Sequence, residues 1–286
     1  MEKTFFIISE DWYFVSHRLF LAKAAIMSGN KVVLLSHFTE HRDIIETEGI
    51  KTIDWPLDRS SKNPFKEIDA LKKVFSTIRK LQPSIIHSVG MKPVLYSAIA
   101  SVFAGFKKNI FALAGLGYVF TSNNKSAKLL RPLLEGVFKL IFRGKKKRLI
   151  LQNPEDKNAL LSANIINPNN VRLIRGAGVD TQSFNVKPIP SPPPIITLPS
   201  RMLWAKGIQD FIVCAKEINK VSKIARFVLV GSPDVQNPDA IPIEMLEDWN
   251  NNGVVEWWGH QNNMPNVLHQ STIVCLPTSY GEGLPK

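Results

Sequence analysis

Residues 185–194 read NVKPIPSPPP, and five of these ten residues are proline. Proline fixes φ and lacks a backbone N–H, so the stretch fits neither a helix nor an inner strand and is typical of an extended linker. We therefore divide the chain of 286 residues into an N-terminal domain (1–184), the linker (185–194) and a C-terminal domain (195–286).

Short apolar runs alternate with segments of helical periodicity on both sides of the linker. Before it, we expect strands at 4–9, 31–36, 50–55, 84–88, 109–113, 147–152 and 171–174, and helices at 17–28, 64–81, 93–105, 125–142 and 154–163. After it, we expect strands at 195–200, 226–231, 254–258 and 273–277, and helices at 207–221, 241–251 and 264–270. This alternation predicts an α/β protein with two Rossmann-like parallel-sheet domains. Ligands of such domains bind at the carboxyl ends of the strands, here in a cleft between the domains.

The chain ends in a pattern typical of a strand-to-helix loop. Residues 278–286 read TSYGEGLPK, with proline near the first turn of the expected helix. The helix itself is not in the sequence, so we expect the C-terminal domain to be incomplete.

The charge balance indicates an anionic partner. Lysine and arginine number 36 against 24 aspartates and glutamates, which gives a net charge of +12. Nucleic acid, a phosphorylated ligand and an anionic membrane surface all fit such a charge. The sequence contains no helix-turn-helix, RNA-binding or zinc-finger pattern, so nucleic acid is not expected as a partner.

Targeting and redox signals favour a cytoplasmic protein. Cys214 and Cys275 have no partner at metal-ligand spacing, which disfavours a zinc site and indicates a reducing compartment. The apolar run at the N-terminus is too short for a signal peptide. The longest apolar stretch, 93–106, is shorter than the roughly 20 residues that span a bilayer, so any membrane contact is expected to be peripheral.

Two stretches of the C-terminal domain carry groups suited to an anionic ligand. Neither a P-loop nor a G-x-G-x-x-G after the first strand is present, which disfavours a P-loop NTPase and a standard dinucleotide dehydrogenase. Residues 200–207 read SRMLWAKG, where Arg201 and Lys206 can both reach one pyrophosphate. The alternative is a solvated loop with two charges.

The second stretch, 282–286, reads EGLPK. A helix N-terminus there would offer free N–H groups to a phosphate or sugar oxygen, and Glu282 can accept hydrogen bonds from sugar hydroxyls. Alternatively, Glu282 is an ordinary acid at a helix N-terminus.

Together these motifs resemble those of the retaining glycosyltransferases of family 4, of the bacterial surface-polysaccharide type, which have the GT-B fold. The family carries R-x-x-x-x-K-G and an E-x₇-E motif that commonly begins E-G-L-P-K. Further similar stretches are QNPED at 152–156, GAGVD at 176–180 and Gly259-His260 followed by Met264-Pro265, so the resemblance covers nearly the whole chain. The second glutamate would fall eight residues after Glu282, and we therefore expect the chain to be cut within this motif.

The resemblance implies roles for these residues. Arg201 and Lys206 would bind the donor diphosphate and stabilise the leaving group, without a metal or other cofactor. Glu282 would contact the donor sugar, assisted by the amides of Gly283 and Leu284. Arg201, Lys206 and Glu282 are thus the expected catalytic residues.

The N-terminal domain would then hold the acceptor. Residues 9–18 read SEDWYFVSHR, in which Ser16 is a candidate N-cap, and His17 and Arg18 are candidates for contact with the acceptor or its phosphate. The alternative is a capping loop on the surface.

Two further stretches are candidates for the acceptor side. Residues 86–93 read IHSVGMKP, where His87 matches the first histidine of the family's H-x-H and Val89 replaces the second. A packed strand-end side chain is the alternative for His87, and Lys92 is a candidate for positive charge. The loop 114–122 is expected to line the cleft through its aromatic residues and through Gly115 and Gly117.

Residues 129–148 read LLRPLLEGVFKLIFRGKKKR; the helical part of this stretch is amphipathic, and the stretch ends in the four cationic residues 145–148. They can form a peripheral contact with anionic lipid, or a core-facing helix with a cationic C-terminal end.

The expected function is transfer of a sugar, with retention, from a nucleotide-diphosphate donor to a polyprenyl-diphosphate-linked or saccharide acceptor in cell-surface polysaccharide biosynthesis. A UDP-sugar is the expected donor, and the inner face of the cytoplasmic membrane the expected location. The alternatives are a truncated, inactive homologue that only binds a partner, and a GT-B epimerase or hydrolase of nucleotide sugars.

Overall fold

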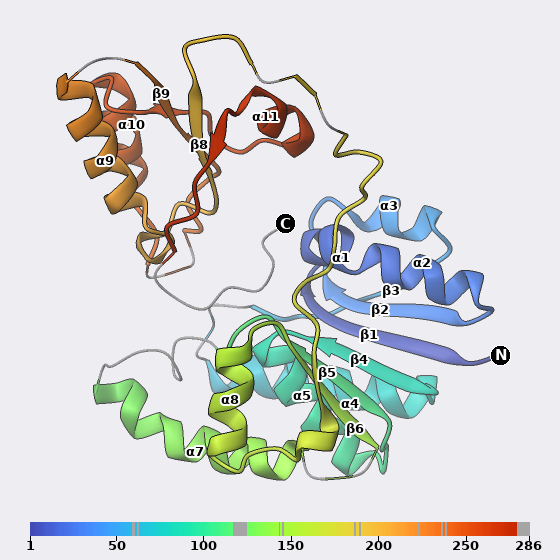
Figure 1. The fold of residues 1–286 in the computed structure, drawn as a ribbon. Coiled ribbons are helices and arrows are strands. Elements are labelled where there is room, and N and C mark those ends of the chain that lie inside the picture. Colours follow the sequence, from blue (N-terminus) through green and yellow to red (C-terminus); the bar gives the residue numbers. More distant parts are fainter. Residues whose placement is uncertain are drawn as a thin grey trace. The chain divides into compact units, whose positions relative to one another are not determined.

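The computed structural model folds into two compact units, one from Met1 to Gly178 and one that begins at Val179 (Figure 1). It describes residues 1–58, 61, 63–116, 125–142, 144, 146–185, 187–188, 190–221, 224–235, 237 and 239–278, with no side chains at 125–130 and 133. The described residues of 185–194 carry no helix or strand. The limits of the predicted domains stay a prediction.

The first unit is built on a parallel sheet. Its strands are β1 (Lys3–Glu10), β2 (Lys31–His37), β3 (Lys51–Asp54), β4 (Ile85–Val89), β5 (Asn109–Leu113), β6 (Lys147–Leu151) and β7 (Val171–Leu173). They form a seven-stranded sheet in the order β3-β2-β1-β4-β5-β6-β7, and every neighbouring pair is parallel. The order reverses between β1 and β4, and ligands of doubly wound sheets bind at such a point.

Helices cover both faces of this sheet (Figure 1). They are α1 (Asp11–His17), α2 (Leu19–Met27), α3 (Arg42–Thr47), α4 (Pro64–Leu81), α5 (Met91–Phe103), α7 (Lys125–Phe142), α8 (Pro154–Ser162) and the 3₁₀ helix η1 (Pro168–Asn170). Side chains alternate along β1, so Phe6 and Ile8 pack with α1, α2 and α3 while Phe5 and Ile7 pack with α4 and α5.

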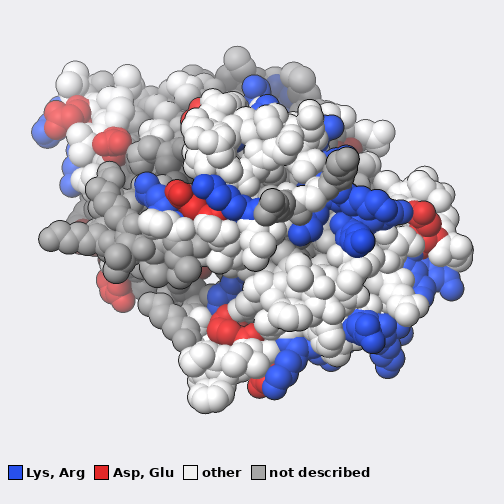
Figure 2. Space-filling model, turned by 90° about the horizontal axis from the view of Figure 1, so that it is seen from below, with Lys and Arg blue, Asp and Glu red and all other residues white. Residues whose placement is uncertain are grey.

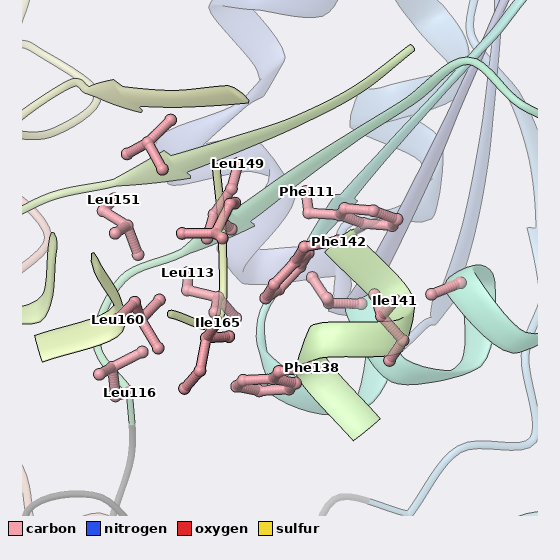
Figure 3. Packing of buried hydrophobic residues seen from close by; sticks show 14 residues of the cluster. Phe111, Leu113, Leu116, Phe138, Ile141, Phe142, Leu149, Leu151, Leu160 and Ile165 are labelled. Carbon is pink, nitrogen blue, oxygen red and sulfur yellow. The ribbon is translucent and has the colours of Figure 1, made fainter. Parts of the chain in front are cut away.

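The C-terminal half of α7 belongs to the core. Phe138, Ile141 and Phe142 are buried against strands β5 and β6, and α8 and the loop after it add Leu160 and Ile165 (Figure 3). The core-facing interpretation of this amphipathic segment is therefore confirmed for Phe138, Ile141 and Phe142, whereas Leu140 is 70% exposed. Among the described residues, no helix combines the length and apolar character that a membrane span needs.

The second unit repeats the pattern with a smaller sheet. Strands β8 (Ile195–Pro199), β9 (Arg226–Val230), β10 (Glu256–Trp257) and β11 (Ile273–Val274) are parallel, in the order β10-β9-β8-β11. The helices are η2 (Trp204–Lys206), α9 (Ile208–Val221), α10 (Ile243–Asn251) and α11 (Met264–Gln270). Leu198, Leu229 and Phe211 lie in its core. The predicted α/β class with two parallel sheets is confirmed.

The first helix differs from the prediction. Helix α1 begins at Asp11, directly after β1, with Glu10 as N-cap, so Ser16 lies inside the helix and is not an N-cap. The Asp11 side chain is fully buried and accepts hydrogen bonds from the backbone N–H groups of Trp12, Thr39 and His41 and from the Thr39 hydroxyl, at 2.7–3.0 Å. Burial acts to raise the pKa of Asp11, but these hydrogen bonds together hold it below its ordinary value. Asp11 thus ties the start of α1 to the loop after β2.

Replacing Asp11 by alanine is expected to lower the free energy of unfolding by about 2–4 kcal/mol, because the backbone N–H groups of Trp12, Thr39 and His41 lose a buried, charged acceptor. Urea unfolding measures the change. Asp43→Ala, an exposed acid in the first turn of α3, is the control and is expected to cost less than about 0.5 kcal/mol. Equal effects of the two substitutions would show that the carboxylate of Asp11 does not hold this loop.

Candidate functional site

The 200–207 loop leaves the carboxyl end of β8 and leads into α9. Arg201 lies just beyond the strand, Lys206 ends the 3₁₀ turn η2, and Gly207 follows with a φ of 74° before α9 begins at Ile208. The structure therefore places Arg201 and Lys206, the two residues predicted to bind the diphosphate, on one loop. This loop lies at the edge of the sheet where α/β proteins bind ligands.

Gly207 is required by a close approach of the backbone. A Cβ at this position would lie 2.0 Å from the carbonyl oxygen of Pro277, and its φ of +74° is one that other residues rarely adopt. The glycine of R-x-x-x-x-K-G thus lets the loop cross the segment that follows β11.

The Arg201 guanidinium is already held by the protein. Its Nη1 donates to Asp234 Oδ2 at 2.8 Å, while 49% of the Arg201 side chain stays exposed. Lys206 is partly buried. Glu282, Gly283 and Leu284 lie outside the described residues, so their predicted roles stay predictions.

In the first unit, the structure brings Arg18 and His87 together. Arg18 lies between α1 and α2, His87 is in β4, and both are buried, with 8% and 5% exposure. Burial, together with the nearby charge of Arg18, lowers the pKa of His87 to about 3. The imidazole is therefore neutral at physiological pH.

Two buried nitrogen atoms in this pair have no hydrogen-bond partner among the described residues. Arg18 Nη1 donates to the carbonyl oxygen of His17 at 2.8 Å, but neither Arg18 Nε nor His87 Nε2 has a hydrogen-bond partner within the described part of the chain. The His87 ring packs edge-on against Phe6, with centroids 5.3 Å apart. Since buried polar groups are normally satisfied, these two atoms are candidates for contact with a ligand or an ordered water.

The other acceptor-side candidates have different surroundings. The His17 ring stacks on Tyr13 at 4.2 Å, and Ser16 Oγ forms a hydrogen bond with His17 Nδ1. Lys92 Nζ donates to the carbonyl oxygens of Asp58 and Ser61 and to Glu67 Oε1, at 2.9–3.0 Å, so its charge braces a loop of the protein.

The two glycine candidates belong to the loop after β5. Gly115 is exposed, and Gly117 lies outside the described residues. Sequence reasoning did not identify the role of Asp156, which pairs with the N-cap Asn153 and accepts a hydrogen bond from the backbone N–H of Leu116. It thereby connects the Gly115 loop to α8.

Lowering the pH from about 6.5 toward 3 is expected to destabilise the fold through His87. Because its folded-state pKa is about 3 against an ordinary 6.5, the unfolded chain binds a proton in this window that the folded chain does not. As the pH is lowered through this window, the contribution of His87 to the free energy of unfolding decreases by at most about 1.4 kcal/mol per pH unit. Urea unfolding at several pH values measures how the free energy of unfolding changes with pH. This change should be smaller per pH unit for His87→Asn than for the unchanged protein, and equal changes would contradict a buried neutral His87.

Residues 3–153 match a family model described as "Glycosyl transferase 4-like", and residues 193–286 match one described as "Glycosyl transferases group 1". A Campylobacter jejuni protein, N,N'-diacetylbacillosaminyl-diphospho-undecaprenol alpha-1,3-N-acetylgalactosaminyltransferase, is 24% identical over 282 residues, which are 94% of this chain and 72% of that protein.

Solved structures show the same fold. A glycosyltransferase from Rickettsia africae superimposes with a TM-score of 0.70 at 18% identity, over 98% of this chain and 74% of that one. Anabaena HepE, in complex with UDP and glucose, gives a TM-score of 0.72 at 13% identity, over 99% of this chain and 76% of the other. This likeness confirms the fold that the sequence predicts.

Proposed function

Because the chain belongs to the glycosyl transferase 4-like family, we propose that this glycosyltransferase moves a sugar from a UDP-sugar to a polyprenyl-diphosphate-linked acceptor, with retention. A relative is named for an undecaprenol-diphosphate-linked acceptor, and a structure of the same fold was solved with UDP. The observation that carries the proposal is the placement of Arg201 and Lys206 on one loop at the carboxyl end of β8.

On the donor side, the reaction breaks the bond between the sugar and the β-phosphate, so negative charge grows on the departing diphosphate. A guanidinium and an ammonium on a loop fixed by Gly207 stabilise that charge more in the transition state than in the ground state. We propose that this stabilisation replaces a metal ion, and transfer is then expected to continue in the presence of EDTA.

On the acceptor side, we propose that Arg18 binds a phosphate of the acceptor. Its guanidinium is charged although burial lowers its pKa, and its Nε lacks a partner among the described residues. The neutral His87 beside it is an additional polar contact, and its low pKa makes it a weak base. Arg18→Ala is expected to raise KM for the lipid-linked acceptor and to leave KM for the donor nearly unchanged.

For the membrane, we propose a peripheral contact on the inner face of the cytoplasmic membrane. A cavity of about 460 Å³ is lined by Lys107, Lys146, Lys147 and the exposed Val102, which is the combination that an anionic lipid surface binds. Lys147 Nζ donates to the carbonyl oxygen of Ile141, so part of the predicted 145–148 charge is bound internally.

Lysine and arginine side chains form several separate patches on the face drawn in Figure 2, with large uncharged areas between them. Vesicle sedimentation tests the proposed membrane contact. We expect Lys107→Glu to reduce binding to phosphatidylglycerol vesicles about fivefold, and Lys216→Glu, on α9, to leave it unchanged. Equal binding to phosphatidylglycerol and phosphatidylcholine vesicles would contradict the proposal.

A donor and acceptor panel tests the proposed function. The protein is incubated with UDP- and GDP-sugars, each with an undecaprenyl-diphosphate-linked saccharide or with the free saccharide, and the products are identified by mass spectrometry. We expect the lipid-linked product to gain one sugar from a UDP donor. Free sugar or an epimerised donor as the sole product would instead indicate a hydrolase or an epimerase.

A further inference from the structure

We propose that Asp234 is a positioning residue that holds the Arg201 guanidinium ready for the donor diphosphate. The proposal rests on the function proposed above, because it gives Asp234 a task in that same donor site. Asp234 lies in the loop after β9, the strand next to β8.

The 232–241 loop braces the backbone of the 200–207 loop at several points. Met202 N–H donates to the carbonyl oxygen of Ser232 at 3.1 Å, and Ile241 N–H donates to that of Met202 at 3.0 Å. Asp239 accepts twice, from Trp204 N–H through its carbonyl and from Ala205 N–H through its carboxylate, at 3.0 and 2.9 Å. The loop that carries Arg201 and Lys206 is therefore built jointly by two segments.

The two aspartates of the bracing loop have different tasks. Asp239 fixes backbone, whereas Asp234 contacts the Arg201 side chain, with Nη1 to Oδ2 at 2.8 Å. The Asp234 side chain is only 17% exposed, and its own carbonyl accepts from Asn237 N–H at 2.7 Å. The Asp234 carboxylate is thus held in place by its surroundings, while the Arg201 side chain that it binds is half exposed.

A fixed acceptor changes what the arginine contributes. An unrestrained arginine loses rotamer freedom when it binds a ligand, and this loss weakens binding. The bond to Asp234 uses one N–H of the fork and orders the guanidinium before the donor arrives. The arginine of this ion pair is half exposed, and pairs that reach the solvent add little to stability, so we expect the effect of Asp234 mainly in donor binding.

A double-mutant cycle tests this assignment, with UDP affinity measured by calorimetry and kcat and KM measured for the donor. We expect Asp234→Ala to weaken UDP binding about tenfold in the otherwise unchanged protein, and to have no effect when Arg201 is already alanine. Asp234→Asn keeps an acceptor oxygen and should restore most of the affinity. Glu244→Ala, an exposed acid at the start of α10, is the control and should change neither quantity.

The outcomes separate this inference from the proposed function. Unchanged or tighter UDP binding by Asp234→Ala, or an equal loss in the Arg201→Ala background, would overturn the positioning role and leave the function standing. Full UDP affinity in Arg201→Ala itself would overturn both. If Asp234→Ala lowers the melting temperature, Asp234→Ser, which is too short to reach Nη1, takes its place with the same expected tenfold loss.

Discussion

Replacing Arg201 or Lys206 by alanine is expected to lower kcat/KM for the nucleotide-sugar donor by about 100- to 1000-fold, the usual effect of removing one preorganised donor to a developing oxyanion. Both residues lie on the loop at the carboxyl end of β8, and charge on the departing diphosphate grows in the transition state. Steady-state transfer from a UDP-sugar measures the loss, and kcat should fall together with kcat/KM.

Two substitutions serve as controls for this prediction. Arg79→Ala in α4 and Lys216→Ala in α9 remove the same charges from exposed helical positions, and both are expected to keep near-normal kcat/KM. If the controls lose as much activity as Arg201→Ala and Lys206→Ala, the effect is one of net charge and the diphosphate assignment fails.

Replacing Gly207 by alanine is expected to lower the free energy of unfolding by about 3–5 kcal/mol, the sum of a left-handed φ and an overpacked contact. The Cβ of the new alanine would lie 2.0 Å from the Pro277 carbonyl oxygen. Because this oxygen belongs to the backbone, it cannot move aside as easily as a side chain would. Urea unfolding followed by circular dichroism measures this loss. Because Lys206 directly precedes the glycine, transfer activity should fall as well.

Gly253 provides a matched control. Its φ of +67° is close to that of Gly207, but a Cβ there would meet nothing within 4 Å. Gly253→Ala is therefore expected to cost about 1 kcal/mol, for backbone conformation alone. Similar losses for the two variants would mean that the contact with Pro277 is not what requires a glycine in this motif.

Strands such as β2, β4 and β9 were predictable from sequence because most of their residues are buried, on both faces of the sheet. Each strand of the described chain overlaps a predicted one, since continuous apolar runs such as VVLL in β2 are typical of parallel sheets. Helices α1 and α3 were not predicted. They have seven and six residues, too few for a helical period to show, and α1 follows β1 without a loop.

The site was predictable in part. The position of the 200–207 loop at the carboxyl end of a strand was predictable, because a strand and a helix flank the motif directly in sequence. Asp234 was not predictable, since it is 33 residues from Arg201 and only the pairing of β8 with β9 brings the two loops together. The burial of Arg18 beside His87 and the internal use of Lys92 likewise depend on packing between distant segments.

The anomeric configuration of the product tests the central claim most directly. The protein is incubated with an α-linked UDP-sugar and an undecaprenyl-diphosphate-linked saccharide, and the new linkage is assigned by NMR. A retaining glycosyltransferase of this family should yield an α-linked product, made in the presence of EDTA and lost in the Arg201→Ala variant. A β-linked product, or release of free sugar without transfer, would contradict the account.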